Sequence, residues 1–348
     1  MKAKIHKQSG KVLSAATALY LSALMSPIRS HKLFCFVAAA LMTQACQPVP
    51  EAVVEQPPAE PRSVMATEVA FTEGPSEYSD GSIFFTEGRT NRILRYYPAE
   101  NRTETFDADS NGANGLVFDT EWRLVACEGT RVTRTNVETG EMEVLADAYG
   151  GKRLNQPNDV TFDSKGRLYF TDRPRANPEP DQTGVHGVYR IDTDGSLHQI
   201  LTDPEIEKPN GIAISPDDTT LYLIEAHPDA GKARMIRAYD LQEDGSVTNM
   251  RVFHDFYPGR SGDGMTIDAA GNLWVAAGLN QLRGTSETLD TEAGVYVFSP
   301  AGEQLDFYPI NEDTVTNVTF AGEGLSTLYL TSGDKLYRIE TDTTGTRR

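Results

Sequence analysis

Short runs of alternating apolar and polar residues recur along most of the chain, separated by clusters of Gly, Asp, Asn and Pro. The stretch QPNDVTFDSKGRLYFTD at residues 156–172 is typical, because it alternates, turns at Lys165-Gly166 and alternates again. Alternation with period two predicts half-buried β-strands, and the Gly-rich and Pro-rich clusters predict turns. After Arg62 we find no convincing long amphipathic helix. The pattern therefore predicts an all-β protein built from antiparallel sheets.

Six copies of this phrase begin with a polar residue at the same position, just ahead of the first apolar run. These residues are Glu73, Asn114, Asn158, Asn210, Asp263 and Asn317, and they are 41, 44, 52, 53 and 54 residues apart. The intervals hold about four strand-like runs each, and four-stranded units of about 40–50 residues are typical of propeller blades. We therefore predict a six-bladed β-propeller with four-stranded antiparallel blades over residues 65–342. Residues 66–72 are the better candidate for the terminal strand that closes the ring, and a pair of β-sandwiches is the alternative fold.

A propeller would bring these six polar residues together. The innermost strand of every blade lines the central channel, so residues at one phase of the repeat face the same axis. Some of these residues could instead serve only to form turns. Asn and Asp before Gly are common in turns, and this would account for Asn114, Asn210 and Asp263. It does not account for Asn158 and Asn317, which precede other residues. Six residues at one phase favour a functional ring of two carboxylates and four amides.

Oxygen donors without His or Cys at this phase favour a hard divalent cation. Ca²⁺ accepts about six to eight oxygen ligands, so a few side chains would leave room for water and a substrate oxygen. Zn²⁺ and Mn²⁺ are the alternatives at an oxygen site. We expect one divalent metal ion, with Ca²⁺ in first place, that acts as a Lewis acid on a carbonyl or phosphoryl oxygen.

Several short motifs, in their order and spacing, resemble the SMP-30/gluconolactonase/lactonase (LRE-like) family of six-bladed propellers. The resemblance covers nearly everything after Met65, and two of the motifs point to the bacterial gluconolactonase-like branch. The motifs are EGP at Glu73, ANGLVFD at Ala113, LVACEGTRVTR at Leu124, LADAYGGKRLNQPNDV at Leu145, KPNGIAIS at Lys208, GDGMTID at Gly262 and TNVTFAG at Thr316.

This resemblance implies a metal-dependent hydrolase that opens the ester of a sugar lactone. It implies that Glu73, Asn158, Asn210 and Asp263 hold the metal and that Asp263 is also the catalytic base. In some members the residue at Asn158 contacts substrate instead. Relatives often carry a histidine where this chain has Gly129, so a substrate contact made by that histidine has no counterpart here.

Four further residues are expected to bind substrate. Asn114 and Asn317 complete the ring, Glu128 ends a channel-proximal strand, and Asp159 follows Asn158. Simpler roles are an exposed strand end for Glu128 and the capping of a turn for Asp159. The Pro-rich residues 171–187 form either a lid over the channel mouth or a surface excursion.

Other mechanisms fit the sequence poorly. The chain lacks the G-x-S-x-G motif of a serine nucleophile, and His186, His227 and His254 are scattered along it. Cys127 lies in an apolar run and is expected to pack in the core. Two alternatives stay open, which are a phosphotriesterase-like hydrolase on the same Ca²⁺ site and a non-catalytic binding propeller that is stabilised by the metal.

Charge narrows the choice of partners. The net charge is −18, yet the first 47 residues carry six bases and no acid, so the rest has 26 Lys and Arg against 50 Asp and Glu. Such a body repels nucleic acid and anionic lipid, and neither is expected as a partner. We expect a small-molecule lactone as the partner and leave the oligomeric state open.

The amino-terminal end resembles an export signal over residues 1–46. Basic residues precede the apolar run at residues 33–42, which has ten residues where a membrane span needs about 20. The order is similar to that of a bacterial lipoprotein signal ending at Cys46, although Thr43 stands where that signal prefers leucine. We expect a periplasmic or lipid-anchored envelope protein in which only this anchor would contact a membrane. A Pro-rich and acidic tether over residues 47–64 and a short tail over residues 343–348 flank the propeller.

Overall fold

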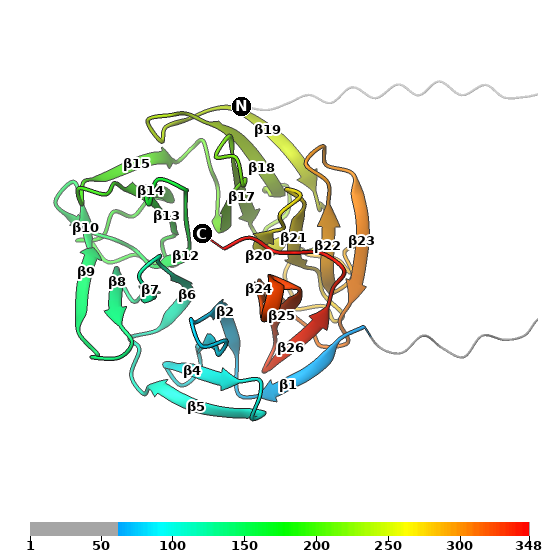
Figure 1. The fold of residues 1–348 in the computed structure, drawn as a ribbon. Helices are drawn as coiled ribbons and strands as arrows, with labels where there is room; N and C mark the ends of the chain where they lie inside the picture. Colours follow the sequence, from blue (N-terminus) through cyan, green and yellow to red (C-terminus); the bar gives the residue numbers. More distant parts are fainter. Residues whose placement is uncertain (1–61, 348) are drawn as a thin grey trace, which may run out of the picture. The chain divides into compact units, whose positions relative to one another are not determined.

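The structure is a computed structural model that describes residues 62–347. These residues form six four-stranded antiparallel sheets arranged around a centre (Figure 1). The predicted fold, an all-β six-bladed propeller with four-stranded antiparallel blades, is confirmed. The expected export signal, Cys46 and almost the whole tether lie outside the described residues. Within the described chain the single helix is a 3₁₀ turn at Glu323–Leu325, and no helix there is long and apolar enough to cross a membrane.

The first five blades each use four consecutive strands that run outward from the channel. The first blade consists of β2 (Thr72–Glu77), β3 (Ile83–Glu87), β4 (Arg92–Tyr97) and β5 (Arg102–Asp107), and the second of β6 (Ala113–Phe118), β7 (Arg123–Glu128), β8 (Arg131–Asn136) and β9 (Met142–Ala146). The third blade consists of β12 (Pro157–Phe162), β13 (Leu168–Asp172), β14 (Gly187–Ile191) and β15 (Leu197–Thr202), and the fourth of β16 (Pro209–Ile214), β17 (Thr220–Ala226), β18 (Arg234–Leu241) and β19 (Val247–Asp255). The fifth blade consists of β20 (Gly262–Ile267), β21 (Leu273–Ala277), β22 (Gly294–Phe298) and β23 (Gln304–Pro309). A two-residue hairpin of β10 (Ala148–Tyr149) and β11 (Lys152–Arg153) precedes the third blade.

The sixth blade joins the two ends of the described chain. It consists of β24 (Val315–Ala321), β25 (Thr327–Ser332) and β26 (Lys335–Glu340), with β1 (Val64–Glu68) paired to β26 on the outside. The prediction of closure by the amino-terminal strand is confirmed, but that strand ends at Glu68 rather than at Thr72. The chain has to turn between the outer edge of one blade and the inner edge of the next, and Thr72 already begins β2.

Apolar residues fill the spaces between blades. Each of the six hydrophobic clusters combines strands of two neighbouring blades, as the predicted alternation requires. Cys127 is fully buried between the second and third blades, which confirms its expected packing role. His254 lies against Phe256 and Phe298, at ring distances of 4.5 and 4.4 Å, and so packs on the cluster between the fourth and fifth blades.

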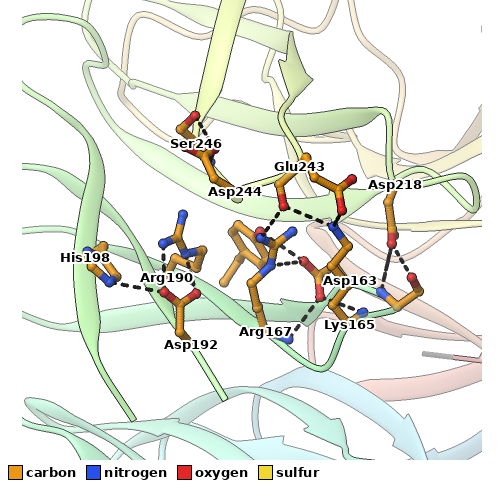
Figure 2. Close-up of polar contacts among 12 residues, drawn as sticks. Asp163, Lys165, Arg167, Arg190, Asp192, His198, Asp218, Glu243, Asp244 and Ser246 are labelled. Carbon is orange, nitrogen blue, oxygen red and sulfur yellow. Dashed lines mark hydrogen bonds and ion pairs between the residues drawn. The ribbon is translucent and has the colours of Figure 1, made fainter. Parts of the chain in front are cut away.

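A polar network joins the third and fourth blades (Figure 2). It lies at the far end of the inner strand from the repeated polar residue, because Asp163 directly follows β12 whereas Asn158 is near its start. Lys165 Nζ donates to the Glu243 carbonyl at 3.0 Å, and Arg167 donates to that carbonyl at 3.0 Å and pairs with Asp163 at 2.6 Å. Gly245 lies in the turn that joins β18 and β19. A Cβ there would lie 2.8 Å from the Arg167 side chain, so this turn packs closely against Arg167. The Arg167–Asp163 pair is buried within the third blade, whereas the Lys165–Glu243 pair, which joins the two blades, is exposed. Exposed ion pairs contribute only about 0–1 kcal/mol each, so the apolar clusters hold the blades together and the network positions the turn between β18 and β19.

Candidate active site

The structure gathers the six repeated polar residues at one end of the inner strands. Each is the second residue of its inner strand, or the third in β24. Asn114 is half-buried, and the other five are buried. We call this set the ring. The residues of the ring are Glu73, Asn114, Asn158, Asn210, Asp263 and Asn317.

An irregularity in strand pairing accompanies the ring in every blade. The register between the inner strand and the second strand shifts at the ring position, for example between Glu73 and Ser76 in β2 and between Gly262 and Met265 in β20. The other four blades show the same shift. A β-bulge bends a strand and redirects its side chains, which here sets the ring residue apart from the regular alternation below it.

The interpretation of the Asn-Gly and Asp-Gly pairs as turns is wrong. Gly115, Gly211 and Gly264 lie inside β6, β16 and β20, and none has a positive φ. A Cβ at Gly115 would lie 2.6 Å from the Asn158 carbonyl oxygen, and one at Gly211 would lie 2.6 Å from the Asp263 carbonyl oxygen. Glycine is needed there because neighbouring inner strands approach closely, not because the backbone turns.

Several contacts join the ring across blades. Asn210 Nδ2 donates to Asp263 Oδ1, and Arg260 pairs with the other oxygen of Asp263. Burial, followed by the charges of Asp263 and Asp159, raises the pKa of Glu73 well above its ordinary value. These three carboxylates, from three different blades, therefore lie close enough to interact.

Arg260 is a site residue that sequence reasoning missed. Its side chain is buried, and besides Asp263 it donates to the Val315 carbonyl at 3.1 Å, which ties the fifth blade to the sixth. No other blade repeats a base three residues before the ring. A search for a repeated oxygen donor therefore has no signal that would find it.

Asp159 does not cap a turn, so that simpler role is wrong. It lies inside β12 and is buried, with Oδ2 accepting from Ile212 N at 3.2 Å and Oδ1 from Asn317 Nδ2 at 3.5 Å. Burial outweighs these hydrogen bonds and raises the pKa of Asp159 to about 7. Asp159 thus adds a buried carboxyl group directly behind the ring.

A cavity of about 410 Å³ lies behind the ring, lined by the inner strands and by Asp159 and Asn317. The expected carboxy-terminal tail closes its other end. Thr346 Oγ1 donates to the Ile267 carbonyl at 2.8 Å, and Arg347 pairs with Glu77. In Figure 1 the chain accordingly ends over the centre of the propeller. The ring and the carboxy-terminal tail therefore lie at opposite ends of the channel.

Carboxylates at the ends of the second strands hold the loops that lead into the ring. Asp172 is fully buried and accepts from Asn155 N at 3.0 Å and Gln156 N at 2.6 Å, and burial raises its pKa to about 6. Glu225 likewise accepts from Lys208 N at 2.6 Å. Glu128 is buried and pairs with Arg131 at 2.7 Å, so its description as an exposed strand end is wrong. Substrate binding by Glu128 stays a prediction.

The Pro-rich loop at residues 171–187 is anchored beside the third blade. Asn155 Nδ2 donates to Thr183 Oγ1 at 2.7 Å and to the Val185 carbonyl at 2.9 Å, and Arg153 pairs with Asp181 at 2.6 Å. His186 pairs with Asp203 and, with the half-buried His227, makes no contact with the ring. The loop is therefore tied to the blade that carries Asn158.

The ring residues suit a hard cation. Asn158 Oδ1 is buried and has no hydrogen-bond partner among residues 62–347, whereas buried acceptors are nearly always paired. A divalent ion would also relieve the repulsion among Glu73, Asp159 and Asp263. The described chain has no cluster of three or more His, Cys, Asp or Glu with metal-site geometry. A ligand set at the ring would therefore combine carboxylate and amide oxygens, which are ligands of hard cations.

Comparison with known proteins shows the family to which the chain belongs. The family described as SMP-30/Gluconolactonase/LRE-like region matches residues 71–334. A gluconolactonase from Zymomonas mobilis is 28% identical over 312 residues, which cover 82% of each chain. A pentonolactonase from Haloferax volcanii is 26% identical over 274 residues, covering 77% of this chain and 84% of its own. The structure of a gluconolactonase from Xanthomonas campestris is similar with a TM-score of 0.67 and 28% identity, over 80% of this chain and 88% of that one.

The fold and the ring define a six-bladed propeller with an oxygen-rich site at one end of its channel. The chain belongs to the SMP-30/gluconolactonase/LRE-like family, as its ordered motifs predicted. With gluconolactonase and pentonolactonase among its relatives, the protein is a lactonase, a hydrolase of carboxylic esters.

Proposed function

We propose that this lactonase opens sugar lactones with the help of one divalent cation, Ca²⁺, held by Glu73, Asn158, Asn210 and Asp263. The observation that carries the proposal is the unpartnered, buried Asn158 Oδ1 next to crowded carboxylates. When bound, the ion would supply Lewis-acid polarisation of the lactone carbonyl and lower the pKa of water. Asn210 would have to turn its oxygen toward the ion, because its nitrogen now faces Asp263.

The protein groups divide the remaining work. Asp263 is the proposed acceptor of the proton from the attacking water, and for this one of its oxygens must be released from Asn210 or Arg260. Asp159 is the alternative acceptor, because its pKa of about 7 is close to neutral pH, where a general base works best. Asn114 and Asn317 line the same end of the channel and are proposed to orient the sugar hydroxyls by hydrogen bonds.

We also propose that the protein works outside the cytoplasm, on the basis of the signal-like residues 1–46, with Cys46 as the residue for lipidation. The phosphotriesterase-like alternative would use the same cation on a phosphoryl oxygen. No contact in the described chain favours it over lactone hydrolysis.

A pH-indicator assay with gluconolactone, galactonolactone and aryl lactones tests the proposal. Turnover should disappear with EDTA and return with Ca²⁺, and Zn²⁺ and Mn²⁺ should be tried in parallel. Glu73→Gln should lose the calcium-induced rise in melting temperature together with activity, whereas Glu68→Gln on the outer strand should keep both. Full activity in EDTA would contradict the metal requirement, and faster hydrolysis of paraoxon than of any lactone would favour the phosphotriesterase.

A further inference from the structure

Two cations beside the ring have no partner. Arg173 directly follows β13, and Lys208 lies two residues before Asn210. Both side chains are half-buried, and neither makes a hydrogen bond or an ion pair within residues 62–347. Arg167 and Arg190, at the other end of the third blade, in contrast each pair with an aspartate at 2.6 Å. In a chain with many more acids than bases, a half-buried cation without a counter-ion calls for an explanation.

The backbone of both residues is fixed at the ring end of the third and fourth blades. Lys208 N donates to the Glu225 carboxylate at 2.6 Å. Arg173 N donates to the Gln156 carbonyl at 3.4 Å, and Gln156 itself is held by Asp172. The scaffold thus positions the two residues while leaving their charged groups unengaged.

The two charges act on the ring itself. Arg173 is among the charges that act on Glu73, although Glu73 belongs to the first blade and Arg173 follows a strand of the third. Burial, and next the charge of Arg173, lower the pKa of Lys208, while Asp263 acts on Lys208 in the opposite direction. The cations Arg173 and Lys208 therefore lie near the ring carboxylates Glu73 and Asp263, at the end of the channel that we call the mouth.

A bound divalent ion would change the balance of charge at this mouth. The ion would neutralise the two ring carboxylates and leave Arg173 and Lys208 in excess. Asp229 and Glu287 also act on Lys208 and offset part of its charge, but no carboxylate pairs with it. The mouth would then be a local positive region on a protein of net charge −18, and such a region attracts anions.

We propose that Arg173 and Lys208 bind an anionic substituent of the substrate, a carboxylate, phosphate or sulfonate, so that the enzyme prefers charged sugar lactones to neutral ones. The proposal rests on the proposed function, because it concerns the same site. A guanidinium binds two oxygens of such a group side by side, and an ammonium adds a point charge. If the two cations only balanced the ring carboxylates, their removal would affect every lactone equally.

Glucono-1,5-lactone and its 6-phosphate differ only in one charged group and are therefore the test pair. We expect kcat/KM for the phosphorylated lactone to exceed that for the neutral one. Arg173→Gln and Lys208→Gln should each reduce this preference by about tenfold, as expected for loss of a charge-assisted hydrogen bond. Arg89→Gln is the matched control, because Arg89 is an exposed cation without a partner at the ring end of the first blade, and it should leave the preference unchanged.

A second measurement uses only the wild-type protein and therefore tests the inference even if a variant fails to fold. For the wild-type protein, KM for the phosphorylated lactone should rise with salt, whereas KM for the neutral lactone should not. Hydrolysis of both lactones with equal efficiency, or equal losses on both in the variants, would overturn the inference and leave the proposed function intact. Absence of hydrolysis of any lactone by the calcium-loaded protein would overturn both.

Discussion

Two sets of carboxylates lie one strand apart in the same propeller and differ in what their oxygens contact. Asp172 and Glu225 end second strands, and both oxygens of each accept hydrogen bonds from loop N–H groups. The ring carboxylate Glu73 receives one hydrogen bond within the described chain, from Gly74 N at 3.1 Å. Asp263 shares its oxygens with Asn210 and Arg260, which are themselves site residues.

The difference teaches that recurrence alone does not identify a functional carboxylate. A carboxylate recurs at the end of the second strand in the first four blades, as Glu87, Glu128, Asp172 and Glu225, just as a polar residue recurs in the ring. Asp172 and Glu225 are saturated with backbone donors and therefore position loops. The ring combines the unpartnered amide oxygen of Asn158 with the neighbouring like charges of Glu73 and Asp263, which are features of a ligand-binding site.

The largest expected effect separates the two sets by activity. Asp263→Asn should lower kcat/KM by about 10²–10³, the usual cost of removing an electrostatic contribution to a transition state. Asp172→Asn is the matched control and should keep activity within about tenfold, because it reaches the ring only through a loop. The measurement is a lactonase assay on variants that melt as single cooperative units. More than a tenth of wild-type activity in Asp263→Asn would remove the distinction.

The next effect separates the sets by stability. Asp172→Ala should lower the free energy of unfolding by about 3 kcal/mol, because the N–H groups of Asn155 and Gln156 lose their acceptor inside the protein. Urea denaturation would measure the loss. Asp194→Ala removes an exposed aspartate that bonds only to its own turn, and it should change stability by less than about 0.5 kcal/mol. Equal losses in the two variants would show that the second-strand carboxylate is not structural.

A smaller effect tests how the ring is packed. Gly211→Ala should destabilise the protein by about 1–3 kcal/mol, because the added Cβ meets the Asp263 carbonyl oxygen at 2.6 Å and backbone cannot move aside as a side chain can. It should also weaken the thermal shift on adding calcium. Gly88→Ala is the control, because its nearest neighbour would be a Phe71 side-chain carbon at 3.5 Å. A neutral Gly211→Ala would mean that the inner strands do not need this close approach.

The smallest effect is a slope with pH. Burial raises the folded-state pKa of Asp172 from 3.8 to about 6, so its contribution to stability is present below pH 3.8 and is lost as pH rises through 6. Between these values wild type should lose up to about 1.4 kcal/mol per pH unit relative to Asp172→Asn. The pKa of Asp194 is lowered by its bonds to Ser196, so Asp194→Asn should show the opposite sign. If the free energy of unfolding changed with pH in the same way for wild type and Asp172→Asn, this would contradict a pKa of Asp172 raised by burial.

The blades and the ring could be predicted because both follow from a period. Alternation places strand faces, and a repeat of about 40–50 residues places one polar side chain per blade at the same height. Arg260, Arg173 and Lys208 could not be predicted in this way, because each occurs in a single blade. The glycines were misread for a related reason, since Asn-Gly is a turn in isolation and becomes a strand pair only when a neighbouring blade presses on it.

The amino-acid sequence by itself determined the fold, the family and which six residues form the ring, because these properties are written in a pattern that recurs along the chain. Only the tertiary structure decided that the second-strand acids hold loops, that Asp159 has a pKa of about 7 and that the carboxy-terminal tail closes one end of the channel. These properties depend on which groups from distant segments of the chain come close together in a buried space. Burial and hydrogen bonding depend on distances in space, and the order of residues along the chain does not give those distances.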